Sequence, residues 1–126
     1  MKKTYQISES EWLVMQCLWK QSPLEIKEIL SMLREKTGWN ANMVRTLVVR
    51  LQEKGAIGAE KSSRFYRYFP IAVEEECVEA ETRSFLNRVF DGSPVKMIAA
   101  LTGNGSLTEQ DCREIEAMLQ QMKGRE

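Results

Sequence analysis

The sequence predicts a mainly α-helical protein that carries one small β-hairpin and divides into two parts. Apolar residues recur at helical spacing in three segments of the first 54 residues. The period then changes to two between Ile57 and Phe69, as expected for paired strands. From Val73 onward the chain turns acidic and returns to helical spacing. With 126 residues, the chain is long enough for one domain of ordinary size and a short appended domain.

The first helix is predicted to begin at a capping box. The Ser8 hydroxyl can accept a hydrogen bond from a backbone N–H of the first turn, while Glu11 reaches back to the backbone of Ser8. Gln21-Ser22-Pro23 ends this helix. Its core-facing side is marked by apolar residues at helical spacing, namely Trp12, Met15, Leu18 and Trp19.

Two further helices are expected before residue 55. The second runs from about Leu24 to Lys36 and has one apolar stripe of Ile26, Ile29, Leu30 and Leu33. Gly38 can adopt the left-handed conformation that ends a helix, and Asn40 is suited to cap the next one. The third helix, residues 40–54, is expected to bury Val44, Leu47, Val48 and Leu51. Its opposite face carries Asn42, Arg45, Thr46, Val49, Arg50 and Glu53.

Two short strands follow the third helix. The strands are expected from Ile57 to Glu60 and from Phe65 to Phe69, with the basic segment Lys61-Ser62-Ser63-Arg64 as the turn and Pro70 as the end. Three helices followed by a hairpin describe a winged helix-turn-helix domain, in which residues 61–64 form the wing. We expect this domain to span residues 1–72.

Residues 73–126 are expected to form a short helical dimerisation domain. Helices are predicted at about 73–90, at 95–101 and from Thr108 onward, with a loop at 102–106. A region this short offers few core positions of its own. We expect an identical copy to cover its apolar residues, through a surface made of Phe85, Leu86, Val89, Ile98, Leu101, Cys112, Ile115, Leu119 and Met122. The alternative is that these helices fold back on the first domain of their own chain.

The residue types present argue against catalysis and against metal binding. The chain has no histidine, which removes the commonest general base and the commonest metal ligand. Its three cysteines form no C-x-x-C or C-x-C pair, and each is expected to be a small buried thiol within a helix. The remaining candidates for catalysis, Ser62 beside Lys61 and the cluster Glu74–Glu76, lack an accompanying base. We therefore expect no enzyme, no metal and no cofactor.

Charge is unevenly distributed along a chain whose net charge is zero. Residues 1–72 contain 12 Lys and Arg and 7 Asp and Glu, giving +5, whereas residues 73–126 contain 6 and 11, giving −5. An electropositive first domain suits contact with nucleic acid. No apolar run approaches the roughly 20 residues that span a bilayer, and Met1-Lys2-Lys3-Thr4 leads into a polar stretch unlike a secretory signal. We expect a cytoplasmic protein without membrane insertion.

The outer face of the third helix has the chemistry to read bases in a DNA major groove. Arg45 could donate a pair of hydrogen bonds to a guanine, and Asn42 could pair with an adenine. Met43 and the methyl group of Thr46 could meet thymine methyl groups. The partner expected from these residues is double-stranded DNA.

Three further cationic residues are expected to bind the phosphate backbone of the DNA. Arg50 lies one turn beyond the base-reading residues, and Lys61 and Arg64 lie in the wing, so all three are expected to contact phosphates. Two alternatives stay open: a solvated helix face whose arginines pair with nearby carboxylates, and a winged helix used for protein contact without specific DNA binding.

Several motifs occur together along the chain: Ile7-Ser-Glu-Ser-Glu-Trp12, Lys36-Thr-Gly-Trp39, the segment from Asn42 to Leu51 followed by Glu53-Lys-Gly55, and the wing Arg64-Phe-Tyr-Arg-Tyr-Phe-Pro70. Through them the sequence resembles the penicillinase and methicillin-resistance repressors, to which copper-responsive repressors are related. The resemblance covers essentially the whole chain. It is strong over residues 5–72 and looser after residue 76, where Phe85-Leu-Asn-Arg-Val-Phe-Asp-Gly92 is still recognisable.

This resemblance implies a homodimeric transcriptional repressor in which each winged helix reads one half of a palindromic operator. In the antibiotic-resistance branch a membrane sensor metalloprotease cuts the repressor, and the corresponding position here is Ala100-Leu101. The Asn-Phe pair of that cut site is absent from this chain. The copper branch carries a pair of C-x-C motifs near the carboxy terminus, where this chain has only Cys112. The inducing signal therefore stays open.

Overall fold

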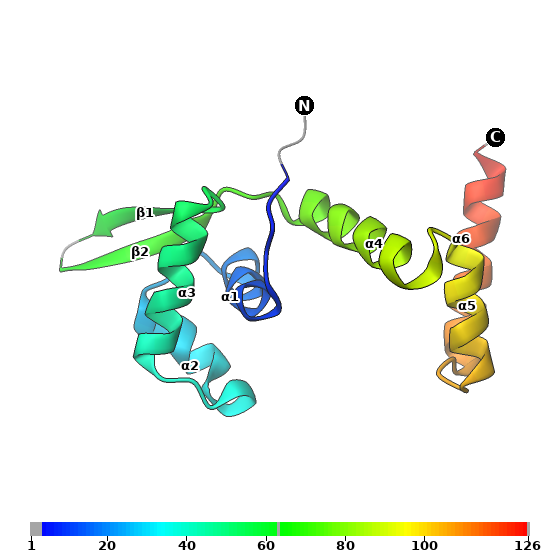
Figure 1. Ribbon diagram of the computed structural model, residues 1–126, viewed down its shortest axis with the longest axis horizontal. Helices are drawn as coiled ribbons and strands as arrows, with labels where there is room; N and C mark the ends of the chain where they lie inside the picture. Colours follow the sequence, from blue (N-terminus) through cyan, green and yellow to red (C-terminus); the bar gives the residue numbers. More distant parts are fainter. Residues whose placement is uncertain (1–3, 63, 126) are drawn as a thin grey trace. The chain divides into compact units, whose positions relative to one another are not determined.

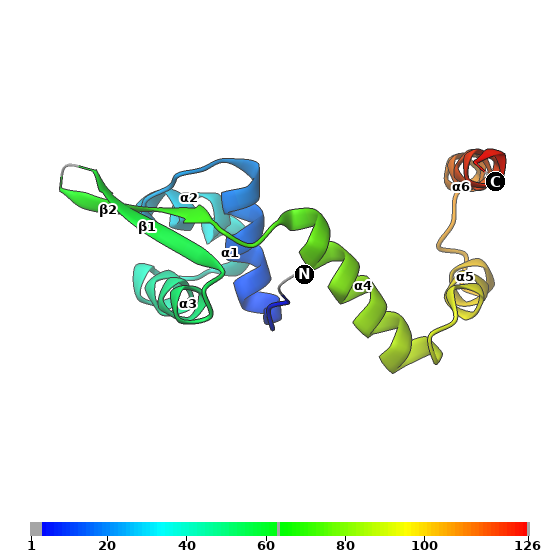
Figure 2. The same cartoon turned by 90° about the horizontal axis from the view of Figure 1, so that it is seen from above.

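The computed structural model describes residues 4–62 and 64–125. Its first part contains three helices and an antiparallel hairpin in the order α1 (Glu9–Lys20), α2 (Ile26–Thr37), α3 (Ala41–Glu53), β1 (Ile57–Ser62) and β2 (Phe65–Pro70). Figures 1 and 2 show the hairpin projecting beside α3 from the body formed by the three helices. The winged helix-turn-helix predicted from the sequence is confirmed.

Local signals in the sequence set the ends of these helices. The Glu11 N–H donates to Ser8 Oγ at 3.2 Å, and the Ser8 N–H donates to Glu11 Oε1 at 2.9 Å, which completes the expected capping box. Gly38 ends α2 with a φ of +73°. Asn40 Oδ1 accepts the N–H of Met43 at 3.0 Å and so caps α3.

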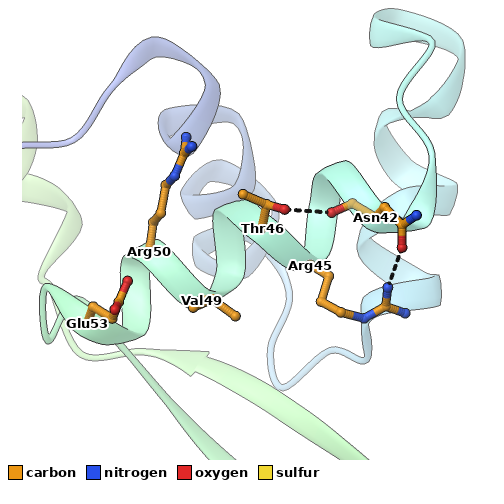
Figure 3. A pocket seen from close by; sticks show the side chains of 6 residues that line it. All are labelled: Asn42, Arg45, Thr46, Val49, Arg50 and Glu53. Atoms are coloured by element: carbon orange, nitrogen blue, oxygen red, sulfur yellow. Dashed lines mark hydrogen bonds between the residues drawn. The ribbon is translucent and has the colours of Figure 1, made fainter.

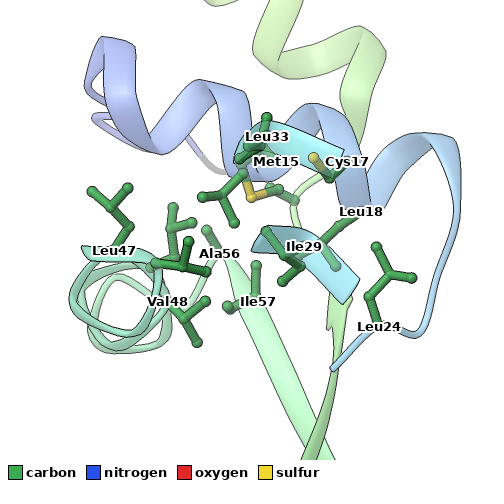
Figure 4. Packing of buried hydrophobic residues seen from close by; sticks show 14 of the residues in the cluster. Met15, Cys17, Leu18, Leu24, Ile29, Leu33, Leu47, Val48, Ala56 and Ile57 are labelled. Carbon is green, nitrogen blue, oxygen red and sulfur yellow. The ribbon is translucent and has the colours of Figure 1, made fainter. Parts of the chain in front are cut away.

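One hydrophobic core joins the three helices to the hairpin (Figure 4). Met15 and Leu18 enter it from α1, and Ile29 and Leu33 enter it from α2. Every residue of the predicted inner stripe of α3 is buried, namely Val44, Leu47, Val48 and Leu51. Burying a side chain of this size is worth about 1.5–3 kcal/mol. The inner stripe therefore fixes how α3 is rotated and leaves its opposite face outward.

The hairpin has a shorter turn than the sequence predicts. Lys61 and Ser62 belong to β1, where they pair with Tyr66 and Phe65 of β2. The expected start of the turn at Lys61 is therefore wrong, because pairing with the aromatic strand continues the ladder through two polar residues. Ser63, which the sequence also assigns to the turn, lies outside the described residues.

The segment before α2 is extended rather than helical. The backbone N–H of Leu24 donates to the carbonyl of Tyr68 at 3.0 Å, and the Tyr68 N–H donates to the carbonyl of Leu24 at 2.8 Å. The helix begins only afterwards, at a second capping box in which the N–H of Glu25 donates to Glu28 Oε1 at 2.8 Å. The bridge ties the wing to the start of α2.

The chain separates into two compact units, Met1–Ala80 and Glu81–Glu126, and the division falls inside α4 (Glu74–Phe90). The first turns of α4 belong to the winged-helix unit because Cys77 is buried in its core. Just before α4, the Trp19 Nε1–H donates to the carbonyl of Ala72 at 2.9 Å. A functional boundary after residue 72 remains a prediction.

The net charge of the winged-helix unit is smaller than that of residues 1–72, because the division between the units falls after residue 80. The unit of residues 1–80 includes four glutamates of α4 and holds 12 Lys and Arg against 11 Asp and Glu. Its net charge is therefore only +1. An electropositive surface on this unit must come from particular faces, not from the unit as a whole.

The second unit contains the end of α4, α5 (Pro94–Gly103) and α6 (Glu109–Gly124). A capping box predicted at Thr108 and Asp111 is present, with N–H to oxygen distances of 3.0 and 3.1 Å. All residues of α5 and α6 are described, and none of them is buried. Among the described residues, no helix combines the length and apolar character needed to cross a bilayer.

Cys112 contradicts the expectation of three buried thiols. Cys17 and Cys77 are buried in the winged-helix unit, but Cys112 is exposed. The reason is that Cys112 lies on α6, which has an amphipathic sequence and no buried position within this chain. Spacing predicts which residues share a face but not whether that face is covered.

Candidate nucleic-acid interface

The outer face of α3 forms a shallow hollow of about 470 Å³. Figure 3 shows the six side chains along this side of the helix. They are the six that the sequence assigns to the face opposite the buried stripe: Asn42, Arg45, Thr46, Val49, Arg50 and Glu53. Burial of one face at helical spacing thus presents a continuous second face to the solvent.

Arg45 is oriented by a neighbour on the same face. Its Nη1–H donates to Asn42 Oδ1 at 2.8 Å, and the Thr46 hydroxyl donates to the backbone carbonyl of Asn42 at 3.0 Å (Figure 3). The Arg45–Asn42 bond uses one of the five N–H donors of a guanidinium. Because both bonds are exposed, they can be exchanged for bonds to a ligand at little cost.

The carboxy-terminal half of the face adds the apolar side chain of Val49 and the charged side chains of Arg50 and Glu53. Arg50 and Arg45 leave α3 on opposite sides in Figure 3. Val49 lies between them in sequence and is 46% exposed. Glu53 ends the face with a carboxylate. The sequence places Val49 and Glu53 on this face but assigns them no contact.

Met43 does not line this hollow. Its side chain is half-buried and packs against the hydrophobic core. A contact between Met43 and a thymine methyl group therefore stays a prediction without support from the packing.

An ion pair that the sequence does not predict holds the end of α3. Lys54, which caps the helix, donates from Nζ to Glu11 Oε1 and to the backbone carbonyl of Gln6. Glu11 is only 2% exposed, whereas the Lys54 side chain is 35% exposed. Burial raises the pKa of the Glu11 carboxyl, but hydrogen bonds from Lys54 and Ser8 outweigh it, so the pKa lies below its ordinary value.

This pair joins two elements that are far apart in the sequence. Glu11 closes the capping box of α1 and at the same time accepts a hydrogen bond from the end of α3. The capping motif reveals only the first of these two roles. Lys54 follows 43 residues later, and no spacing rule connects the two positions. The pair fixes the carboxy-terminal end of α3 against the start of α1.

The wing carries its cations beside aromatic rings. Lys61 Nζ lies 5.9 Å from the ring centroid of Tyr66, and Arg64 Cζ lies 5.9 Å from that of Phe65. All four side chains are exposed. Cation–π contacts of this kind restrain the long side chains without withdrawing their charge from the solvent. The charges of Lys61 and Arg64 are thus open to the solvent, and their contact with phosphates stays a prediction.

The residues expected to join two chains lie on α4, α5 and α6. Leu86, Leu101 and Ile115 are half-buried. The other members of the set are exposed: Phe85, Val89, Ile98, Cys112, Leu119 and Met122. The expected cleavage position, Ala100-Leu101, lies inside α5.

Known sequences decide the family of this chain. The chain matches the penicillinase repressor family over residues 7–121. It is also 32% identical over 125 residues to the penicillinase repressor of Bacillus licheniformis, a match that covers 99% of this chain and 98% of that protein. The chain belongs to the penicillinase repressor family. A further relative is the methicillin resistance regulatory protein MecI of Staphylococcus aureus strain N315, with 26% identity over 93% of this chain and 95% of that protein.

Solved structures agree with the family and with the fold. The solution structure of the DNA-binding domain of the repressor BlaI matches with a TM-score of 0.53 and 34% identity, covering 60% of this chain and 93% of that one. Monomeric BlaI of Bacillus licheniformis in complex with the blaP half-operator matches equally well. A MarR/EmrR family regulator from Acinetobacter, at 16% identity and a TM-score of 0.51, covers 94% of this chain and 75% of that one and shares only the fold.

Proposed function

We propose that this member of the penicillinase repressor family is a cytoplasmic DNA-binding repressor that inserts α3 into the major groove of its operator. The observation that carries the proposal is the outer face of α3, where polar and cationic side chains line one hollow opposite a fully buried stripe. A helix in a major groove needs such a face. The relative bound to the blaP half-operator supports the same use here.

Base reading is assigned to the amino-terminal half of this face. Arg45 donates two hydrogen bonds to a guanine, exchanging its bond to Asn42 for one of them. Asn42, once released from Arg45, pairs with an adenine. Thr46 and Val49 offer methyl groups to thymine, which gives the exposed Val49 a role on a polar face.

Contacts with the phosphate backbone of the DNA are assigned to cations on α3 and on the wing. Arg50 reaches phosphate from the carboxy-terminal half of α3, while Lys61 and Arg64 reach phosphate from the wing. These contacts raise affinity and salt dependence without reading sequence. They would also allow a unit with a net charge of only +1 to bind a polyanion, because these three cations lie on the outer face of α3 and on the wing.

Two copies are proposed to act together on a palindromic operator. The described helices α5 and α6 contain no buried residue, although their sequences carry apolar residues at helical spacing. An exposed apolar set of this kind is typical of a surface that another chain covers. We assign dimerisation to the set from Phe85 to Met122 named above. Two linked half-site readers bind far more tightly than one.

We propose that derepression occurs when the two copies of the dimer separate. One route is cleavage by a membrane sensor metalloprotease at Ala100-Leu101 in α5. A protease must unwind this helix locally before it can cut, so cleavage would remove α6 from the dimer surface. Another signal that separates the two copies would have the same effect.

Selection from a random duplex library tests this proposal. The full chain should enrich an inverted repeat whose half-sites are separated by about one helical turn. Binding to the selected duplex should weaken steeply as salt is raised. Sedimentation equilibrium on the same protein should show a dimer. If no sequence is enriched and the protein sediments as a monomer, both parts of the proposal are wrong.

A protein-contact role for the winged helix is the second candidate. The observation in its favour is the exposed Val49, because an apolar residue at the centre of a helix face also suits a protein partner. The same library distinguishes the two functions. A chain that enriches no duplex but retains its fold would support protein contact in place of DNA reading.

A further inference from the structure

A second pocket lies between the start of α2, the start of α3 and the wing. Its volume is about 340 Å³, and it is more enclosed than the hollow on the outer face of α3. Small-molecule sites in proteins occupy roughly 300–1,000 Å³ and are mainly apolar with a few polar groups. The apolar part of this lining consists of Ile26, Leu30, Ala41 and the aromatic ring of Tyr68. The volume therefore lies at the low end of the range for a small ligand, and the lining combines apolar with polar groups.

Cations and aromatic rings share the rest of the lining. Lys27 Nζ lies 5.8 Å from the ring centroid of Phe65, and Arg64 Cζ lies 5.9 Å from the same centroid. The Phe65 ring is therefore in cation–π contact with Lys27 of α2 and with Arg64 of the wing. Arg45 lines the pocket as a third cation, and Tyr66 adds a second exposed ring.

The charges around the pocket do not balance. Against the three cations stands one carboxylate, that of Glu25, which lies 3.6 Å from Lys27 Nζ. A neutral apolar ligand would leave this excess positive charge without a partner. An anion with a planar apolar body satisfies both parts of the lining, because its ring can stack on the aromatic side chains while its carboxylate accepts hydrogen bonds from the cations.

We propose that this pocket is a binding site for a small aromatic carboxylate, and that its occupation weakens binding of DNA. The second statement rests on the proposed function of α3. Arg45 lines both this pocket and the hollow on the outer face. A carboxylate in the pocket competes with the operator for the Arg45 guanidinium. Because the coupling is reciprocal, DNA must weaken binding of the ligand by the same factor.

Titration of the full chain with 2-naphthoate, followed by amide NMR shifts in the absence of DNA, tests the site itself. The shifts should saturate and should be concentrated on the lining residues. The neutral analogue 2-naphthamide should bind about tenfold more weakly or worse, because it offers no charge to the cations. Naphthamide binding as tight as that of naphthoate, or shifts spread over the apolar residues of α5 and α6, would overturn the assignment.

Two lysine variants separate pocket binding from general attraction. Lys27→Met removes a cation whose side chain is 76% exposed, so the fold should persist while naphthoate binding falls about two- to fivefold. Lys20→Met makes the same change at the end of α1, on a residue that does not line the pocket, and should leave naphthoate binding unchanged. Equal losses in both variants would contradict a specific site.

The effect on DNA is measured with the duplex selected from the library. Naphthoate should raise the dissociation constant of wild-type protein for this duplex, and Lys27→Met should require proportionally more naphthoate for the same increase. Saturable naphthoate binding without any change in DNA affinity would overturn the coupling. A protein that binds naphthoate but no DNA at all would contradict the proposed function and leave the ligand site standing.

Discussion

Replacement of Lys54 by methionine tests how α3 is held in its reading position. The substitution keeps most of the aliphatic side chain and removes the ammonium group that donates to Glu11 and to the carbonyl of Gln6. The Glu11 carboxylate, only 2% exposed in the wild type, then keeps only its hydrogen bonding to Ser8 in the capping box. The expected effect is a less stable winged-helix unit in which the end of α3 moves more freely.

The size of the effect follows from the burial of the two partners. Removing one partner of a fully buried ion pair costs about 3–5 kcal/mol. Here Lys54 is 35% exposed, so water can reach the carboxylate once the ammonium is gone. We therefore expect a loss of about 2 kcal/mol in the free energy of unfolding at neutral pH.

The effect must also depend on pH. In the wild type the pKa of Glu11 lies below its ordinary value, so the pair stabilises the fold above the unfolded-state pKa, and this stabilisation is lost as pH falls through the folded-state pKa. In Lys54→Met, desolvation by burial is opposed only by Ser8, so the pKa of Glu11 rises relative to wild type. The difference in stability between the two proteins should therefore shrink as pH is lowered from 7 to about 4.

Urea unfolding followed by tryptophan fluorescence measures this difference in the right part of the molecule. All three tryptophans, Trp12, Trp19 and Trp39, lie in the unit Met1–Ala80. Lys36→Met, in the last turn of α2, is the matched control for loss of a cation near a helix carboxy terminus. A stability difference for Lys54→Met that equals the control, or that does not change between pH 7 and 4, would refute the role of the ion pair.

Three further predictions concern the wing, the cap and the thiols. Gly58→Ala should destabilise the wing by about 1 kcal/mol, because a Cβ there would lie 2.5 Å from Cζ of Phe69 and the half-buried ring must turn to make room; an unchanged midpoint of urea unfolding would contradict this. Asn40→Ala should cost about 1 kcal/mol and weaken binding of the selected duplex, since it uncaps the N–H of Met43; full DNA affinity in the variant would oppose it. At concentrations where the chain is monomeric, Cys112 should react fastest with a disulfide reagent, because it is exposed while burial raises the pKa of the other two thiols; dimerisation should slow its reaction, and equal rates for all three thiols in the monomer would count against the fold.

The α3 helix is the element that sequence reasoning recovers best. Its cap at Asn40, its four buried residues and its six outer residues all follow from local rules, because capping and helical spacing involve residues at most one or two turns apart. The wing is recovered less completely. Strand register is set by pairing between residues distant in sequence, and Lys61 therefore extends β1 although its own type suggests a turn.

Other features require the three-dimensional structure. The Glu11–Lys54 pair links positions that no periodicity relates, and the bridge between Leu24 and Tyr68 depends on how the wing folds over α2. The pocket that shares Arg45 with the outer face combines residues from three elements. Cys112 is expected to be buried but is exposed, for another reason. Burial of Cys112 requires a covering surface that this chain does not itself supply.

Binding of wild-type protein, Arg45→Ala and Arg34→Ala to the selected duplex and to a scrambled duplex tests the central claim most directly. Arg34 lies in the last turn of α2, away from the hollow, and controls for the loss of one positive charge. The account predicts that Arg45→Ala weakens binding of the selected duplex by about 1–3 kcal/mol, relaxes the preference at one base position and changes binding of the scrambled duplex little. Arg34→Ala should bind as wild type does. If wild type does not distinguish the two duplexes, or if Arg45→Ala keeps the full preference, α3 does not read DNA in the way proposed.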